Sequence, residues 1–360
     1  MGRKILTGKE LEDFLNAVVI GAWKINRDGT IDVNGNIKIK INYIPCNFNK
    51  VTGHCVFTQL ASLEGSPREV TGHFICIDNR LTSLEGSPRE IGGDFDCRSN
   101  QLTSLEGSPI EVTGRFICSY NNLTSLKGAP KKIEGSFNCS NNQLTSLKGS
   151  PRETGGNFDC IDNKLTNLEG APRKVGSYFD CRSNQLTSLE GSPREVGGNF
   201  DCRFNKLTSL KGSPIKIGGN FDCTYNYDQL ISLEGSPREV GGSFDCSNNQ
   251  LTNLKGAPEK TGNSFLCIAN QLTSLEGSPR KVGGNFFCDY NYLTSLEGSP
   301  VEVTGSFGCS ENDLTSLEGS PRKVGGNFDC RSNQLTSLEG MPKYIGGDLN
   351  IQYNWKILEN

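Results

Sequence analysis

Cysteine is the most chemically versatile side chain in this 360-residue sequence, which contains fifteen of them. Thiols can bind metal ions, pair as disulfides or act as nucleophiles. Apart from Cys46, they recur every 21 residues with one interval of 23. The series runs Cys55, Cys76, Cys97, Cys118, Cys139, Cys160, Cys181, Cys202, Cys223, Cys246, Cys267, Cys288, Cys309 and Cys330. Such a constant interval indicates a repeating structural unit.

The pattern around each thiol favours a place in a protein core. The sequence has no C-x-x-C pair, the spacing typical of zinc sites, and each Cys stands between Phe and Leu positions. Adjacent coils would lie about 4.8 Å apart, which does not by distance exclude disulfides. A column of free thiols nevertheless suits a core in a reducing compartment. We expect buried, unpaired cysteines.

The two histidines offer one alternative chemistry. His54 and His73 lie near Cys46 and Cys55, so a zinc cluster is a candidate, but no paired ligand spacing accompanies them. Neither histidine has a recurring partner for a Ser-His or Cys-His site. The sequence therefore predicts no catalytic residues, no metal ligands and no cofactor, and we expect a protein that is not an enzyme.

The repeat reads F-x-C-x-x-N-x-L-T-S-L-E-G-S-P-R-E-V-G-G-x, and positions are counted below from its cysteine. Alternation in x-F-x-C-x predicts a strand with one buried side. Asn at +3 would bond the backbone of neighbouring coils, and Leu at +5 and +8 would point inward. Gly at +10, +16 and +17 permits positive φ or close backbone approach, and Pro at +12 opposes a helix. Each coil would depend on its neighbours for stability.

This unit resembles the leucine-rich repeat, L-x-L-x-x-N-x-L, with Phe and Cys in the first two apolar places. The resemblance covers roughly residues 51–354. It implies a leucine-rich-repeat solenoid of about fifteen 21-residue coils, with a parallel β-sheet on the concave face and an extended, turn-rich convex side. The unit is also similar to the short repeats of bacterial effectors.

A second resemblance involves the segment before the repeats. The lead-in 26–36, NRDGTIDVNGN, is similar to one that uncharacterised bacteriophage proteins place before such repeats. That resemblance implies a phage-encoded protein acting in the host cytoplasm.

Both ends of the array show signs of caps. We expect an N-terminal cap over 1–50, with a helix over 7–19 and a β-hairpin over 22–41. The helix would begin with a capping box, Thr7-Gly8-Lys9-Glu10, and the hairpin would turn at Asn34-Gly35. The solenoid would span 51–347, and 348–360 would form a C-terminal cap closed by Trp355, Ile357 and Leu358.

Charge and hydropathy exclude two classes of partner. The formal net charge is −3, so no global positive field attracts a nucleic acid. No run approaches eighteen apolar residues, so no membrane span is expected. The first residues also lack a signal-peptide core. The sequence predicts a cytoplasmic protein.

Variable positions on the strand indicate where a partner would bind. The outward positions should be −3, −1, +1 and +2. Asp recurs at −1 in five successive coils, and Arg182 and Arg203 lie two residues after two of these carboxylates. Mixed charge fits this column better than calcium, because a flat stripe cannot surround an ion. The five are Asp159, Asp180, Asp201, Asp222 and Asp245.

Aromatic residues cluster beside that column, next to the single two-residue insertion. Exposed Tyr, Phe and Arg around charges are typical of protein-binding hot spots. The candidate partner-binding residues are Tyr178, Asp180, Arg182, Asp201, Arg203, Phe204, Asp222, Tyr225, Tyr227 and Asp228. Two alternative patches are Leu266, Ile268, Phe287, Tyr290 and Tyr292, and Ile75, Ile77, Ile117 and Tyr120. A face with no single patch stays open as well.

These patterns predict a non-catalytic solenoid that recognises a protein partner through its concave face. If the phage resemblance holds, inhibition of a host defence protein is the expected role. The alternative is a structural or self-assembling accessory protein, either a virion component or an end-to-end array through its end caps.

Overall fold

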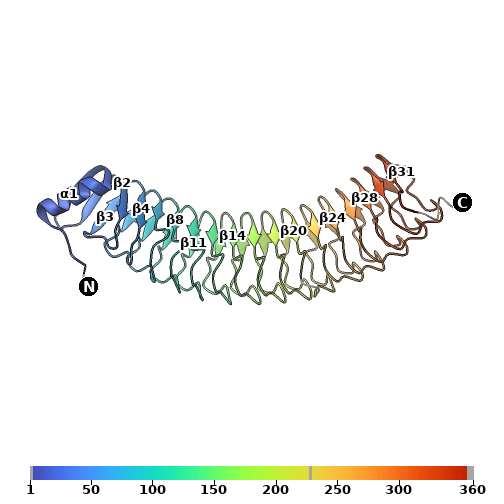
Figure 1. Cartoon of the computed structure of the whole chain (residues 1–360), viewed down its shortest axis with the longest axis horizontal. Helices are drawn as coiled ribbons and strands as arrows, with labels where there is room; N and C mark the ends of the chain where they lie inside the picture. The colour runs from blue at the N-terminus through green and yellow to red at the C-terminus, as the bar shows by residue number, and fades with distance from the viewer. Residues whose placement is uncertain (1–2, 227–228, 355–360) are drawn as a thin grey trace. The chain divides into compact units, whose positions relative to one another are not determined.

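The computed structural model describes residues 3–226 and 229–354 as a parallel-strand solenoid of about fifteen coils. Its residues fall into two compact units. The first unit comprises 1–165 and 169–177, and the second comprises 166–168 and 178–360. Within each unit the coils stack in sequence order, with equivalent strands side by side (Figure 1). The leucine-rich-repeat solenoid predicted from the sequence is confirmed.

Every coil contributes two short strands to two parallel ladders, where one strand per coil was expected. The Val ladder lies near +14 and +15, and the Phe ladder lies at −2 and −1. The Val ladder contains, in the first unit, β3 (Phe48–Val51), β5 (Glu69–Val70), β7 (Glu90–Ile91), β9 (Glu111–Val112), β11 (Lys132–Ile133), β13 (Glu153–Thr154) and β15 (Lys174–Val175), and, in the second unit, β17 (Glu195–Val196), β19 (Lys216–Ile217), β21 (Glu239–Val240), β23 (Lys260–Thr261), β25 (Lys281–Val282), β27 (Glu302–Val303), β29 (Lys323–Val324) and β31 (Tyr344–Ile345).

The Phe ladder carries the thiol column on its buried side. Its members in the first unit are β4 (Cys55–Thr58), β6 (Phe74–Ile75), β8 (Phe95–Asp96), β10 (Phe116–Ile117), β12 (Phe137–Asn138) and β14 (Phe158–Asp159), and in the second unit β16 (Phe179–Asp180), β18 (Phe200–Asp201), β20 (Phe221–Asp222), β22 (Phe244–Asp245), β24 (Phe265–Leu266), β26 (Phe286–Phe287), β28 (Phe307–Gly308), β30 (Phe328–Asp329) and β32 (Leu349–Asn350). The ladder is in register, so Phe200 pairs with Phe221 and Asp201 with Asp222.

The core is a set of one-residue columns. The Phe rings stack along each unit, for example Phe200 on Phe221 with centroids 5.4 Å apart, and the Leu columns at +5 and +8 are buried. All fifteen cysteines are free and buried, as predicted. Burial raises the pKa of the Cys118 thiol and of its neighbours Cys97 and Cys139 in the column, so these thiols stay protonated.

Asparagine at +3 joins adjacent coils, as predicted. The Asn205 side-chain amide donates to the carbonyl oxygens of Cys181, Cys202 and Arg203, each at 3.1 Å, and Asn205 Oδ1 accepts from the Leu186 amide at 3.0 Å. Asn205 is fully buried. One side chain thus satisfies four backbone groups at the bend that follows each Phe-ladder strand.

The structure of the N-terminal cap differs from the prediction in two details. Helix α1 spans Gly8–Val18, and the N-cap Thr7 makes no side-chain capping bond, so the capping box is wrong. Strand β1 (Val19–Ile25) pairs antiparallel with β2 (Ile31–Lys40), so the hairpin turns within 26–30.

Asn34-Gly35 lies in the middle of β2 rather than at the hairpin turn. Gly35 pairs with Gly21, and a side chain at Gly35 would collide with the Ile20 carbonyl, so this glycine permits close strand approach. Strand β2 pairs with β3 before this point and with β4 after it. The dipeptide therefore marks the place where one strand passes from the Val ladder to the Phe ladder.

The remaining boundaries are less fully tested. The domain bounds 1–50, 51–347 and 348–360 stay a prediction, and Trp355, Ile357 and Leu358 lie outside the described residues. No helix in the described parts of the chain has the length and apolar character needed to cross a membrane.

Candidate protein-binding surface

The outward side of the Phe ladder, here called the Phe-ladder face, contains a structural column that the sequence analysis treated as variable. At −3, a side chain accepts a hydrogen bond from the next coil's −3 amide. Asn199 Oδ1 accepts from the Asn220 amide at 2.9 Å, Asn220 Oδ1 accepts from Ser243 at 2.8 Å, and Ser243 Oγ accepts from Ser264 at 3.3 Å. The recurrence of Asn and Ser at −3 was the signal that could have revealed it.

The two histidines belong to the same column. His54 Nδ1 accepts from the His73 amide and His73 Nδ1 accepts from the Asp94 amide, each at 2.9 Å. Their rings stack with centroids 4.7 Å apart. These bonds occupy the Nδ1 lone pairs, so both histidines serve the stack. No cluster of three or more metal-ligating side chains occurs within the described residues.

The Asp column at −1 is less exposed than its outward position suggested. Asp180 and Asp201 are 1% and 2% exposed, because Arg and Tyr side chains cover them. Arg203 Nη2 lies 2.7 Å from Asp201 Oδ2, and Arg203 Nε lies 3.0 Å from Asp201 Oδ1. The Tyr178 hydroxyl donates to Asp201 Oδ2 at 2.8 Å, and burial together with Asp180 and Asp201 raises the pKa of Tyr178.

The arginines bridge successive coils of the column. Arg182 lies 3.3 Å from Asp180 and 3.8 Å from Asp201. Arg203 reaches beyond Asp201 to Asp222 at 3.3 Å. The predicted pairing of Asp and Arg is therefore present, and the charges form one connected network in the second unit.

Two aromatic rings lie beside this network. Phe204 and Tyr225, both at +2, stack with ring centroids 5.1 Å apart, and 46% of Tyr225 is exposed. The +2 residue takes a positive φ in every coil from Asp78 to Tyr353, a conformation that costs a non-glycine residue about 1 kcal/mol. The sequence gives no sign of this bend, because the residue types at +2 vary. The candidates Tyr227 and Asp228 lie outside the described residues.

Eight of the ten predicted residues thus lie together on one face of the second unit. The geometry offers half-buried guanidinium groups beside a stacked ring pair in which Tyr225 is exposed. Such a surface can bind a complementary protein.

Comparison with known proteins finds distant structural similarities only. No protein-family model and no curated protein matches the chain. Among solved structures it is similar to YopM from Yersinia enterocolitica WA-314, with a TM-score of 0.43 and 20% identity over 86% of this chain and 80% of that chain. It is also similar to the leucine-rich effector protein YopM from Yersinia pestis, with a TM-score of 0.40 and 17% identity over 89% and 88%. Likenesses this distant assign no role to any residue.

The second predicted patch adjoins the charged network along the Phe-ladder face. Leu266 and Phe287 occupy −1 in β24 and β26 and pair in register. Tyr290 and Tyr292 are 60% and 58% exposed. In the first unit, by contrast, the third patch exposes one large side chain, Tyr120, while Ile75 and Ile117 are half-buried.

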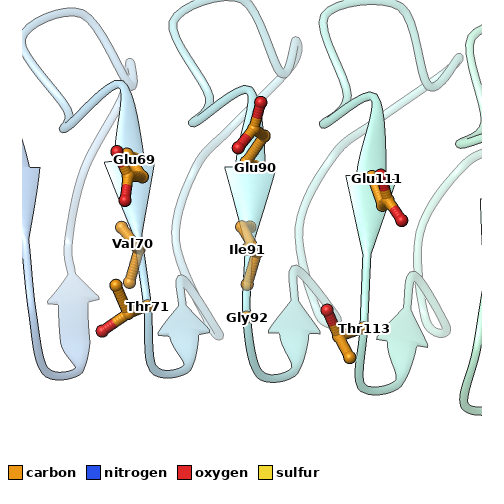
Figure 2. A pocket seen from close by; sticks show the side chains of 8 residues that line it. All are labelled: Glu69, Val70, Thr71, Glu90, Ile91, Gly92, Glu111 and Thr113. Carbon is orange, nitrogen blue, oxygen red and sulfur yellow. The ribbon is translucent and has the colours of Figure 1, made fainter.

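The Val ladder forms a shallow pocket in the first unit. Figure 2 shows Glu69, Glu90 and Glu111 in a row on consecutive strands, above Ile91. Lys50 lies 2.6 Å from Glu69, and Lys132 lies 3.0 Å from Glu111. The glutamate side chains are exposed to solvent, and the two at the edges of the row each pair with a lysine. The row is therefore a weaker candidate for a binding site than the Phe-ladder face.

Proposed function

We propose that this chain is a non-catalytic recognition protein that binds another protein through the Phe-ladder face of its second unit. One observation carries the proposal. The half-buried ring of Phe204 stacks on the exposed ring of Tyr225 next to an ordered Arg–Asp network. Rigid aromatics and held guanidinium groups bind with little loss of side-chain entropy, which is typical of hot-spot residues.

The resemblance to bacteriophage repeat proteins suggests the source of the partner. On that basis we propose a host protein as the partner and inhibition of a host defence protein as the role. Comparing complexes captured from host lysate with those from an unrelated lysate, with mass-spectrometric identification, tests this part. Capture of the same proteins from both lysates would contradict it.

The site itself is tested by a double substitution with a matched control. Arg203→Ala with Tyr225→Ala should abolish capture of the partner. Arg98→Ala with Tyr120→Ala removes the same residue types from the same register positions in the first unit, where Arg98 also pairs with an Asp at −1, at 3.3 Å. The control should leave capture unchanged. Equal loss in both variants, or in neither, would contradict the assignment.

Self-assembly is the second candidate, because one observation favours it. Strand β1 pairs with β2 on one side, and its Ile20 and Ile25 are exposed. An apolar edge strand is a template for pairing with another chain. Sedimentation of the purified full chain decides this point. A concentration-dependent rise in mass that Ile20→Lys abolishes would support assembly, whereas a constant monomer mass would contradict it.

A further inference from the structure

The −1 column of the second unit changes character along the Phe ladder. In register order it contains four carboxylates, then two apolar side chains and a glycine. The order is Asp180, Asp201, Asp222, Asp245, Leu266, Phe287 and Gly308. Strand spacing in a sheet places successive members about 4.8 Å apart. A partner lying along the column would therefore meet acidic groups first and apolar groups next.

The first two carboxylates have their own cations, and the next two do not. Position +1 is Arg182 after Asp180 and Arg203 after Asp201, but Thr224 and Ser247 follow Asp222 and Asp245. Asp222 Oδ1 accepts from the Thr224 amide at 3.1 Å, and Asp245 Oδ1 accepts from the Ser247 amide at 3.0 Å. The same amide bond is present in the first two coils, so the third and fourth coils differ from them in lacking a guanidinium group at +1.

Little positive charge reaches this part of the column. Within the described residues, the cation nearest Asp222 is Arg203 at 3.3 Å, and its two-pronged bond is to Asp201. Burial raises the pKa of Asp222 to about 6, and the charges of Asp245 and Asp201 add to the rise. Burial also raises the pKa of Asp245. Both shifts are the response of carboxylates that are partly desolvated without a matching cation.

The two apolar side chains that follow the carboxylates in the −1 column are accessible to a partner. Leu266 and Phe287 are half-buried on the outward side of their strands. A methyl group at Gly308 would lie 2.8 Å from the Asp289 carboxylate and 2.9 Å from the Phe287 ring, so the absence of a side chain there makes room for both groups. Its φ is not positive, so packing rather than backbone conformation explains this glycine.

We propose that the protein partner presents an extended segment along this column, with an arginine on Asp222 and Asp245 and a large apolar side chain on Leu266 and Phe287. The inference rests on the proposed function and names the chemistry of the partner. The chain's own residues supply the template, since Arg182 and Arg203 each bridge two successive carboxylates of the same column. The ring pair Phe204–Tyr225 adds aromatic faces beside the guanidinium.

Geometry sets the spacing of the two anchors. The midpoint of the two carboxylates and the midpoint of the two apolar residues are two coils apart, or about 10 Å. An extended segment in the polyproline II conformation has three residues per turn and rises about 3.1 Å per residue, so side chains three positions apart point to the same side about 9 Å apart. The arginine and the apolar residue should therefore be three positions apart. The recognised pattern is therefore Arg-x-x-apolar.

Fluorescence anisotropy with labelled peptides and the full-length chain tests this pattern. The probe is Gly-Arg-Gly-Gly-Leu-Gly, blocked at both ends, and the comparison peptides carry Gln in place of Arg or Gly in place of Leu. We expect each comparison peptide to bind at least about tenfold more weakly, the effect of losing roughly one good contact. We also expect the affinity of the Arg peptide to fall with added salt. Equal binding of all three peptides would overturn the inference.

A substitution that supplies the missing cation from within the chain tests the location. Ser247→Arg should compete with the peptide and reduce its binding at least about tenfold. Ser140→Arg is the matched control, because Ser140 is also a buried +1 residue, follows the neutral Asn138, and accepts from the Ile161 amide as Ser247 accepts from Ile268. Circular dichroism confirms that both variants fold.

The outcomes separate this inference from the proposed function. Loss of peptide binding in Ser247→Arg and not in Ser140→Arg supports the inference, and the reverse or equal loss overturns it. If Arg203→Ala with Tyr225→Ala abolishes capture of a protein while the peptides bind indifferently, the recognition face stands and the Arg-x-x-apolar pattern fails. If the peptides discriminate while no protein is lost from the double variant, the proposed function fails instead.

Discussion

The same arrangement of an Asp, an Arg and a Tyr occurs in both units, and its surroundings differ. Asp96, Arg98 and Tyr120 occupy −1, +1 and the next +2 in the first unit, as Asp201, Arg203 and Tyr225 do in the second. The Arg98 guanidinium makes one ion pair with Asp96, at 3.3 Å, and 47% of the Arg98 side chain is exposed. Arg203 contacts Asp201 through two guanidinium nitrogens and also contacts Asp222. Its side chain is 29% exposed.

Two neighbouring positions account for the difference. Ser99 and Ile117 in the first unit correspond to Phe204 and Asp222 in the second. Phe204 gives Tyr225 a ring to stack on, and Asp222 gives Arg203 a second carboxylate. The repeat therefore fixes where side chains project, while a few variable residues decide whether they form an ordered surface.

The largest expected effect is on the free energy of unfolding, and it tests whether the asparagine at +3 stabilises both units in the same way. Asn205→Ala and Asn100→Ala each leave buried backbone groups unsatisfied, since both side chains donate to three carbonyls and accept from one amide. Each should lower the free energy of unfolding by about 3 kcal/mol. Urea unfolding followed by circular dichroism measures this, with the exposed Gln185→Ala as control. A large loss in one unit alone would break the comparison.

The next effect isolates the carboxylate that the first unit lacks. The folded-state pKa of Asp222 is raised to about 6 from 3.8, so the folded protein binds the proton more tightly than the unfolded chain does. In the wild-type protein, the contribution of Asp222 to the free energy of unfolding therefore falls as the pH rises from about 4 to 6. Asp222→Asn should gain about 2 kcal/mol relative to wild type above pH 6 and nothing below pH 4.

Thermal unfolding across pH 3.5–8 measures that difference. Ile117→Asn, the equivalent position in the first unit, controls for the new amide and should show no pH-dependent gain. If the change in stability caused by Asp222→Asn did not depend on pH, the Asp222 carboxylate would have a matching cation, which contradicts the prediction.

A smaller effect concerns the hydroxyl that covers the column. Tyr178→Phe removes the bond from the Tyr178 hydroxyl to Asp201 and should cost about 1 kcal/mol. Tyr120→Phe removes an exposed hydroxyl in the first unit and should cost nothing measurable. Equal effects in thermal unfolding would contradict the ordered network in the second unit.

The smallest effect is expected on the outer surface of both units. Lys127 and Glu106 are 2.6 Å apart in the first unit, and Lys211 and Glu234 are 3.3 Å apart in the second, with all four side chains largely exposed. Exposed pairs contribute little because water and salt screen them. Lys127→Gln and Lys211→Gln should leave the melting temperature unchanged in differential scanning calorimetry. A clear drop would mean that charge pairing, and not only the core, holds the coils together.

The repeat made the scaffold predictable, because Phe, Cys, Asn and Leu each have one role in every coil. Features that the repeat pattern does not mark could not be predicted, for physical reasons. The two-residue Val-ladder strands are too short to show alternation, and Asn34-Gly35 follows turn statistics although strand β2 uses it for close approach. The binding-face residues could be placed on a side, but the burial of Asp201 depends on Tyr178 and Arg203 together, which spacing does not reveal.

Site-directed photo-crosslinking tests whether a partner binds the Phe-ladder face of the second unit. A photoreactive benzoylphenylalanine is placed at Tyr225 on the Phe-ladder face of the second unit, and separately at Ile110 on the first unit, which is 61% exposed. We expect a single protein adduct from position 225 in host lysate and none from position 110. An adduct from position 110 alone, or the same adducts from both positions, would contradict recognition by the Phe-ladder face.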